Sequence, residues 1–174
     1  MSETRPAVEA PHLFLDIDGV LNCHEFDKRI MCGQIHKDKV ALLNWVLTET
    51  GARIVLSSAW RYLVYRGEMN LRGLEWLLRS HGILADRLVG ITREDTVKTV
   101  NGYNGDPITW HQQDERGKEI AEWVRANGVR RYAVVDDLDL GIREAGHPFV
   151  QTEGKVGLTD EAAALLIELL RGKE

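Results

Sequence analysis

The sequence predicts an α/β fold of three layers, in which a parallel sheet of about five strands is covered by helices on both faces. Short apolar runs alternate with segments whose apolar residues recur at helical spacing, and three of the runs end directly in polar side chains. With 174 residues, 44% of them hydrophobic, the chain is long enough for one domain with a substantial core and short for two. We therefore expect a flexible N-terminal lead-in of residues 1–10 and one domain over residues 11–174.

The first predicted strand is the apolar run of residues 12–15, which ends in the turn-forming sequence DIDG. A short apolar run closed by a turn is typical of a buried parallel strand. In open α/β sheets ligands bind beside the carboxyl ends of the strands. Two carboxylates so close together need a cation or a shared proton, so Asp16 and Asp18 are candidate ligands of a divalent metal. The simpler interpretation is a polar turn that closes an ordinary strand.

The next elements imply a parallel crossover. Residues 30–35 are compatible with a small hairpin around Gly33. Apolar residues at helical spacing predict a helix over residues 37–50, and Gly51 lies just beyond its end. A strand at residues 53–56 follows, and the order strand, helix, strand places the two strands parallel in one sheet.

The second half of the chain continues this alternation. Residues 92–115 are rich in Gly, Asn, Asp and Thr and exceed the length of an ordinary connection, so we expect a functional loop there. The remaining predicted helices cover residues 71–80, 116–127 and 159–171, and the remaining predicted strands cover residues 87–91, 132–135 and 148–151.

Polar pairs follow three of the predicted strands. Because the carboxyl ends of parallel strands meet at one edge of a sheet, we expect these side chains to lie close together. The coincidence of carboxylates at two strand ends with hydroxyls at a third is hard to attribute to turn composition alone. The three pairs are Asp16 with Asp18, Ser57 with Ser58, and Asp136 with Asp137.

These motifs resemble those of the haloacid dehalogenase-like (HAD) superfamily of phosphatases and phosphotransferases. DIDGV at residues 16–20 is similar to the first motif of that superfamily, ARIVLSS at residues 52–58 to the second, and Asp136-Asp137 to the acidic fourth motif. The resemblance extends from Leu13 to about Leu170 and implies a Rossmann-like fold. The closing FVQTEGKVGLT is similar to a group of short bacterial and phage members.

The resemblance implies roles for the first two motifs. Asp16 would be the nucleophile that forms an aspartyl-phosphate, and Asp18 would be the general acid and base. Ser57 would hydrogen-bond the transferring phosphoryl group, with Ser58 as a competing candidate. Serine is also favoured at helix N-caps, and a helix start can itself bind phosphate, so the two interpretations of this pair are compatible.

The third motif of the superfamily is a Lys or Arg that stabilises the phosphoryl charge, and here the sequence leaves two candidates. Arg116 and Lys118 both lie at a suitable distance before the fourth motif. Side chains two residues apart on a helix point in different directions, so only one of them can easily face the site.

The resemblance also implies a Mg²⁺ site made of oxygen ligands. Asp16, the backbone carbonyl of Asp18, Asp136 and Asp137 would hold the metal, and Asp139 is a weaker candidate. The alternative for the acidic pair after the fourth strand is a capping or loop role.

Trp60 and Arg61 follow the second motif directly. An aromatic ring beside a cation can stack on a base and contact a phosphate, so both are candidates for the substrate edge of the site. Packing is the simpler interpretation for Trp60 alone. For His24, His36 and His111 a solvated side chain is the simpler interpretation.

No large cap domain fits between the motifs. A helix and a strand use most of the 38 residues from 19 to 56, and residues 92–115 suffice for a loop but not for a folded cap. An uncapped site stays open to solvent, which favours a phosphate on a polynucleotide end or a protein, or a nucleotide held by the loops. The short format and the SSAWR edge are similar to phosphatase modules of nucleic-acid end-repair enzymes.

The preferred hypothesis is thus a Mg²⁺-dependent phosphomonoesterase acting on a nucleotide or polynucleotide-end phosphate. The alternatives are a non-catalytic binding or partner module, a phosphatase of a phosphoprotein or small metabolite, and phosphotransfer to an acceptor other than water. The lack of a cap to exclude water disfavours the last.

The net charge of -5 argues against a generally basic surface that coats nucleic acid, because tight non-specific binding needs many cationic contacts. A local basic patch is compatible with it. There is no apolar run of about 18 residues and no charged head followed by an apolar stretch, so we expect a soluble, cytoplasmic protein without a membrane segment. Cys23 and Cys32 are then expected to be reduced thiols.

Overall fold

A computed structural model of the chain describes residues 9–23, 34–93, 97–101, 107–111 and 115–172. Most of the predicted lead-in, residues 1–8, and most of the predicted hairpin, residues 30–33, lie outside the described residues.

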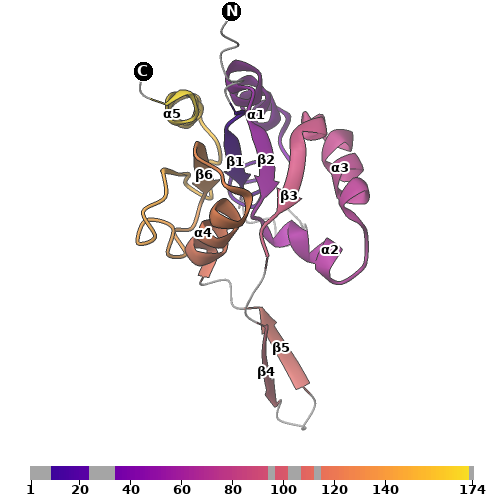
Figure 1. The fold of residues 1–174 in the computed structure, drawn as a ribbon. Helices are drawn as coiled ribbons and strands as arrows, with labels where there is room; N and C mark the ends of the chain where they lie inside the picture. The colour runs from indigo at the N-terminus through magenta and orange to yellow at the C-terminus, as the bar shows by residue number, and fades with distance from the viewer. Residues whose placement is uncertain (1–8, 24–33, 94–96, 102–106, 112–114, 173–174) are drawn as a thin grey trace, which may run out of the picture.

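The centre of the fold is a five-stranded sheet in the order β3-β2-β1-β6-β7, in which every neighbouring pair is parallel (Figure 1). The predicted parallel sheet of about five strands is confirmed. Its strands are β1 (His12–Leu15), β2 (Arg53–Leu56), β3 (Leu88–Ile91), β6 (Tyr132–Asp136) and β7 (Phe149–Gln151).

The four helices that the apolar spacing predicts are all present. The last begins one residue later than predicted, because Thr159 is its N-cap and its hydroxyl accepts a hydrogen bond from the Ala162 amide. The α-helices are α1 (Lys37–Thr50), α2 (Tyr62–Tyr65), α3 (Leu71–Ser80), α4 (Arg116–Asn127) and α5 (Asp160–Arg171), and the 3₁₀ helices are η1 (Ala59–Arg61) and η2 (Ala85–Arg87).

Alternate side chains of the sheet pack against different helices. On one face Leu13 and Leu15 belong to the larger hydrophobic cluster, which includes buried residues of α1, α3 and α5. On the other face Phe14 and Val134 pack with Ile120 of α4. Helices therefore cover both faces of the sheet, which confirms the three-layer fold.

The strand order fixes where a ligand is expected. From β1 the chain moves outward through β2 to β3, and it then returns through α4 to the other side of β1, where β6 and β7 follow. The strand order thus reverses between β1 and β6. In open α/β sheets the ligand crevice lies at such a switch point, outside the carboxyl ends of the strands.

Residues 92–115 contain a strand pair that the sequence analysis does not predict. The strands β4 (Val97–Asn101) and β5 (Pro107–His111) are antiparallel, in a register that pairs Val97 with His111, and they extend away from the parallel sheet in Figure 1. The pattern misses them because the Gly, Asn and Asp residues of the segment break its strand-favouring residues into short runs. Five residues in each strand make no large cap, in line with the prediction for this part of the chain.

Within the described ranges, no helix combines the length and the apolar character needed to cross a membrane.

Candidate active site

The register of the central strands places three predicted site residues side by side. Asp16 directly follows β1, Ser57 directly follows β2, and Asp136 is the last residue of β6. The ladder continues to this level, because the Ser57 amide donates to the carbonyl of Leu15 and the Asp16 amide donates to that of Val135, both at 3.0 Å. By the alternation along each strand, the three side chains lie on the face that α4 covers.

The first residue of α4, Arg116, places its guanidinium against two of these side chains. Its Nη1 lies 3.2 Å from Oδ1 of Asp16 and also pairs with Oδ2 of Asp136. All three side chains are buried. Of the two cations that the sequence leaves open, Arg116 thus reaches the carboxylates. Lys118 is exposed, and its ammonium lies 2.6 Å from Glu115.

Burial dominates the electrostatics of this cluster. Desolvation raises the pKa of Asp16 to about 8; Arg116 opposes the rise, and Asp136, Asp18 and Asp137 add to it. Desolvation also raises the pKa of Asp136 against the influence of Arg116. Burial alone would lower the pKa of Arg116, but the fields of Asp136 and Asp16 outweigh it and raise the pKa, so the guanidinium stays charged. The carboxylates outnumber the positive charge beside them.

The same carboxylates fit a hard divalent cation. Oxygens of Asp16, Asp136 and Asp137 lie within 4.8 Å of one another. An all-oxygen donor set is the kind that Mg²⁺ prefers, and the positive charge of such an ion would favour the ionised form of these buried carboxylates. The side chain of Asp18 is not in this group. Asp139 instead pairs with Arg143 at 3.2 Å.

A close approach of two loops holds Asp18 at the edge of the cluster. The side-chain amide of Asn22 donates to Oδ1 of Asp18 at 2.7 Å, and its oxygen accepts from the Gly19 amide at 2.9 Å. Gly19 has a φ of +77°, and a Cβ there would lie 2.4 Å from Cγ of Asp137, so a larger residue would push the two loops apart. Asn22 is not among the site residues predicted from the sequence. The sequence feature that could have indicated this contact is the position of Asn22 four residues after Asp18.

The two serines differ in how their hydroxyl groups are hydrogen-bonded. The hydroxyl of Ser57 is fully buried and has no hydrogen-bond partner among the described atoms. The hydroxyl of Ser58 accepts from the Trp60 amide at 3.3 Å and so caps η1. A buried hydroxyl without a partner is costly, and a ligand oxygen beside Asp16 would satisfy it.

The position of Arg61 differs from the predicted substrate edge. Its side chain is 1% exposed, and Nη1 donates to the backbone carbonyls of Ser57 and Ser58 at 2.5 and 3.0 Å. Nη2 lies 2.9 Å from Oε2 of Glu119, which the sequence analysis also passes over. The chain enters η1 directly after Ser58, and this tight turn directs the guanidinium back beneath the loop instead of outward.

The aromatic and imidazole candidates lie as follows. Trp60 is partly exposed, packs against the larger core cluster, and its ring centroid is 6.4 Å from that of His81. His36 is exposed just before α1, His111 belongs to β5, and His24 lies outside the described residues.

Comparison with known families agrees with this geometry. A family model for the HAD domain in Swiss Army Knife RNA repair proteins matches residues 12–163, a range that includes the three strand ends and the start of α4. Comparisons with curated proteins and with solved structures gave no match. The match covers most of the chain, and the five-stranded parallel sheet agrees with it. The chain therefore belongs to the HAD superfamily, in the family of HAD domains in Swiss Army Knife RNA repair proteins.

Proposed function

We propose that the protein is a Mg²⁺-dependent phosphomonoesterase that acts through an aspartyl-phosphate. The observation that carries this proposal is the position of Asp16, which is buried at the carboxyl end of the central strand. It contacts the guanidinium of Arg116, and the neighbouring strand end carries Ser57, whose hydroxyl has no hydrogen-bond partner among the described atoms. A nucleophile, a hydroxyl donor and a fixed cation around one point are the groups that phosphoryl transfer requires.

The chemistry takes two steps. A carboxylate oxygen of Asp16 bonds to phosphorus, the bond from phosphorus to the leaving oxygen breaks, and Asp18 gives that oxygen a proton. Water then attacks the aspartyl-phosphate and gives its proton to Asp18, which releases inorganic phosphate and restores Asp16. Ser57 and Arg116 bind the phosphoryl oxygens in both steps.

The proposed metal site consists of Asp16, Asp136 and Asp137. A Mg²⁺ ion bound there would supply the positive charge that offsets the repulsion between a carboxylate nucleophile and an anionic phosphate. Arg116 would then be free to turn from the carboxylates toward the phosphoryl group.

For the substrate we propose a polynucleotide-end or nucleotide phosphate. Two observations support it: the matching family is described from RNA repair proteins, and the described residues form no large cap over the carboxyl edge of the sheet. With a net charge of -5, recognition has to be local rather than spread over the surface.

The test is turnover of a generic aryl phosphate with and without Mg²⁺, followed by a panel of 3′- and 5′-phosphorylated oligonucleotides, nucleoside monophosphates and phosphopeptides. Asp16→Asn is expected to abolish turnover. Asp139→Asn, which changes a carboxylate paired with Arg143 on the surface, is the matched control and is expected to keep it. A protein that binds Mg²⁺ but hydrolyses nothing in the panel would be a binding module rather than a phosphatase.

A further inference from the structure

Helix α3 presents one large aromatic side chain to solvent. Trp76 is 71% exposed, the largest exposed fraction among the described large hydrophobic residues. The opposite side of the helix anchors it, because Leu74 and Leu78 are fully buried in the larger core cluster. The indole of Trp76 therefore contributes little to the packing of the helix. A single exposed apolar side chain needs no explanation by itself, but the neighbours of this one are informative.

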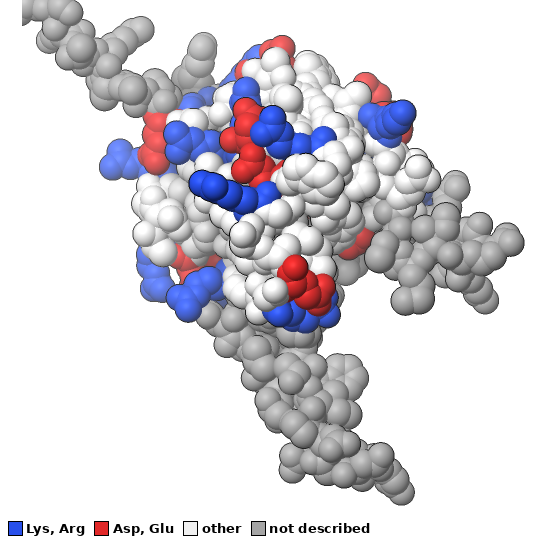
Figure 2. All heavy atoms as spheres, turned by 90° about the vertical axis from the view of Figure 1, so that its right-hand side faces the viewer, with Lys and Arg blue, Asp and Glu red and all other residues white. Residues whose placement is uncertain are grey.

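Two cations flank Trp76 on the same side of α3. Arg72 lies four residues before it and Arg79 three residues after it, so the three side chains follow one stripe along the helix. Together with Glu75 they line an open pocket of about 370 Å³. Glu75 offsets Arg79 only through a long, exposed contact of 3.4 Å. Figure 2 faces the side of the molecule that carries α3, where Lys and Arg side chains lie among Asp and Glu side chains around a largely uncharged surface.

The C-terminal end of α3 approaches the segment that follows β2. Arg79 lies two residues before His81, an exposed residue whose ring contacts that of Trp60. The backbone amide of Trp60 in turn donates to the hydroxyl of Ser58, in the loop that follows β2. The residue that follows α3 thus contacts the segment that begins with Ser57 and Ser58 at the carboxyl end of β2.

We propose that Arg72, Trp76 and Arg79 form a binding site for the single strand of a polynucleotide whose terminal phosphate enters the active site. The indole would stack on one base, and the two guanidinium groups would contact phosphates on either side of it. The strand must be unpaired at this position, because a base in a duplex has no free face. This inference rests on the polynucleotide substrate proposed above.

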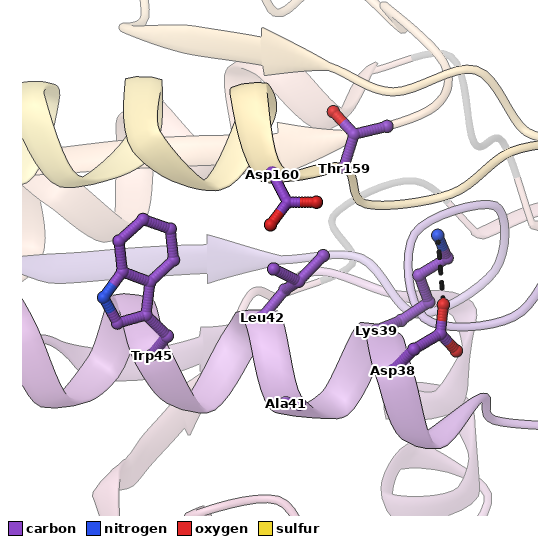
Figure 3. A pocket seen from close by; sticks show the side chains of 7 residues that line it. All are labelled: Asp38, Lys39, Ala41, Leu42, Trp45, Thr159 and Asp160. Atoms are coloured by element: carbon purple, nitrogen blue, oxygen red, sulfur yellow. Dashed lines mark ion pairs between the residues drawn. The ribbon is translucent and has the colours of Figure 1, made fainter.

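The second exposed tryptophan on the described surface has the opposite surroundings. Trp45 of α1 is 42% exposed, and its groove between α1 and α5 contains the carboxylates of Asp38 and Asp160 (Figure 3). The one ammonium there, that of Lys39, lies 3.4 Å from Asp38. This groove disfavours a polyanion, so Trp45 is a matched control for Trp76.

The test is fluorescence anisotropy with a labelled single-stranded RNA of about ten nucleotides, within the usual range of single-strand site sizes. The probe carries no terminal phosphate, so binding does not depend on turnover.

Trp76→Ala is expected to weaken binding about tenfold, as the loss of one stacked base predicts. The affinity of Trp76→Phe is expected to fall between that of Trp76→Ala and that of the wild type. Arg72→Ala and Arg79→Ala are each expected to reduce the slope of log Kd against log salt by about 0.7. Trp45→Ala and Arg125→Ala, an exposed change on α4, are expected to match the wild type.

Equal affinity of Trp76→Ala and Trp45→Ala would overturn the proposed site, and so would equal binding of a blunt duplex. Failure of the wild type to bind the RNA would also overturn it and would leave the stripe as a surface for an acidic protein partner. Aryl phosphate turnover by the wild type separates these results from a failure of the proposed function. Turnover with no effect of Trp76→Ala on RNA binding rejects this site alone, whereas RNA binding without turnover rejects the phosphatase.

Discussion

The guanidinium of Arg61 and the carboxylate of Glu119 form a buried ion pair, with Nη2 2.9 Å from Oε2 and side chains 1% and 5% exposed. The same guanidinium binds the backbone carbonyls of Ser57 and Ser58. Glu119 lies three residues after Arg116 on α4. The pair therefore holds the loop with the candidate phosphate-binding hydroxyl at a fixed position relative to the helix that carries the candidate phosphate-binding cation.

Breaking this pair is expected to affect both stability and turnover. Glu119→Gln leaves the charge of Arg61 buried without its carboxylate, so we expect a loss of about 3 kcal/mol of unfolding free energy in urea titrations. Arg61→Lys keeps the charge but loses the planar fork, and we expect kcat to fall at least about tenfold with a smaller change in KM, because the loop and Arg116 lose their alignment. Arg66→Lys, at the exposed Arg66–Glu68 pair, should change stability by less than about 1 kcal/mol. Turnover by Arg61→Lys equal to that of the Arg66 variant would contradict the positioning role.

The strands and most of the site follow from the sequence for one physical reason. A parallel strand covered on both faces is apolar where it is buried, so residues 13–15 and 54–56 stand out as continuous apolar runs with sharp ends. The polar residues at those ends then share an edge by topology alone. Asp16, Ser57 and Asp136 are therefore predicted to lie together without any knowledge of side-chain geometry.

The remaining features of the site depend on three-dimensional geometry that the sequence pattern does not encode. Arg61 points inward because a three-residue 3₁₀ helix follows Ser58 directly, and its partner Glu119 lies 58 positions away in the chain. Spacing alone could not decide between Arg116 and Lys118, because the rotation of α4 against the sheet determines which one faces Asp16. The strands β4 and β5 escape detection because turn-forming residues break their segment into runs of only five residues.

The two serines are expected to give opposite results when each is replaced by alanine. Ser57→Ala removes a buried hydroxyl that has no partner among the described atoms, so stability should hold or rise slightly, while kcat/KM should fall about 10- to 100-fold through loss of a hydrogen bond to a charged phosphoryl group. Ser58→Ala removes the cap of η1, so it should cost about 1 kcal/mol of stability and leave kcat/KM nearly unchanged. Urea denaturation and steady-state kinetics on the same preparations check both. The reverse pattern would assign the phosphate contact to Ser58.

Arg116 and Lys118 provide a similar comparison on α4. Arg116→Ala removes the one guanidinium that contacts both Asp16 and Asp136, so phosphatase turnover should fall by at least about a hundredfold, as for other groups that stabilise a transferring phosphoryl charge. Lys118→Ala removes an exposed ammonium paired with Glu115, and kcat should stay within about twofold of the wild type. If Lys118→Ala were the more damaging change in a kinetic assay, the third motif would have to be reassigned.

The raised pKa of Asp16 predicts how pH and Mg²⁺ act together on stability. Burial raises this pKa from 3.8 in the unfolded chain to about 8 in the metal-free fold, so between these values the folded state holds a proton that the unfolded state has released. The resulting stabilisation is fully present below about pH 4 and is lost as pH rises toward 8, so the Tm of the metal-free protein should decline over that range.

Mg²⁺ binds the ionised carboxylates and competes with the proton, so a fixed Mg²⁺ concentration should raise Tm more at pH 8 than at pH 6. Asp16→Asn removes the titrating group, so its Tm should depend less on pH and respond less to Mg²⁺. A Mg²⁺ shift in the wild type that is equal at both pH values would mean that the ion does not displace a proton from this cluster, and it would separate the metal site from Asp16.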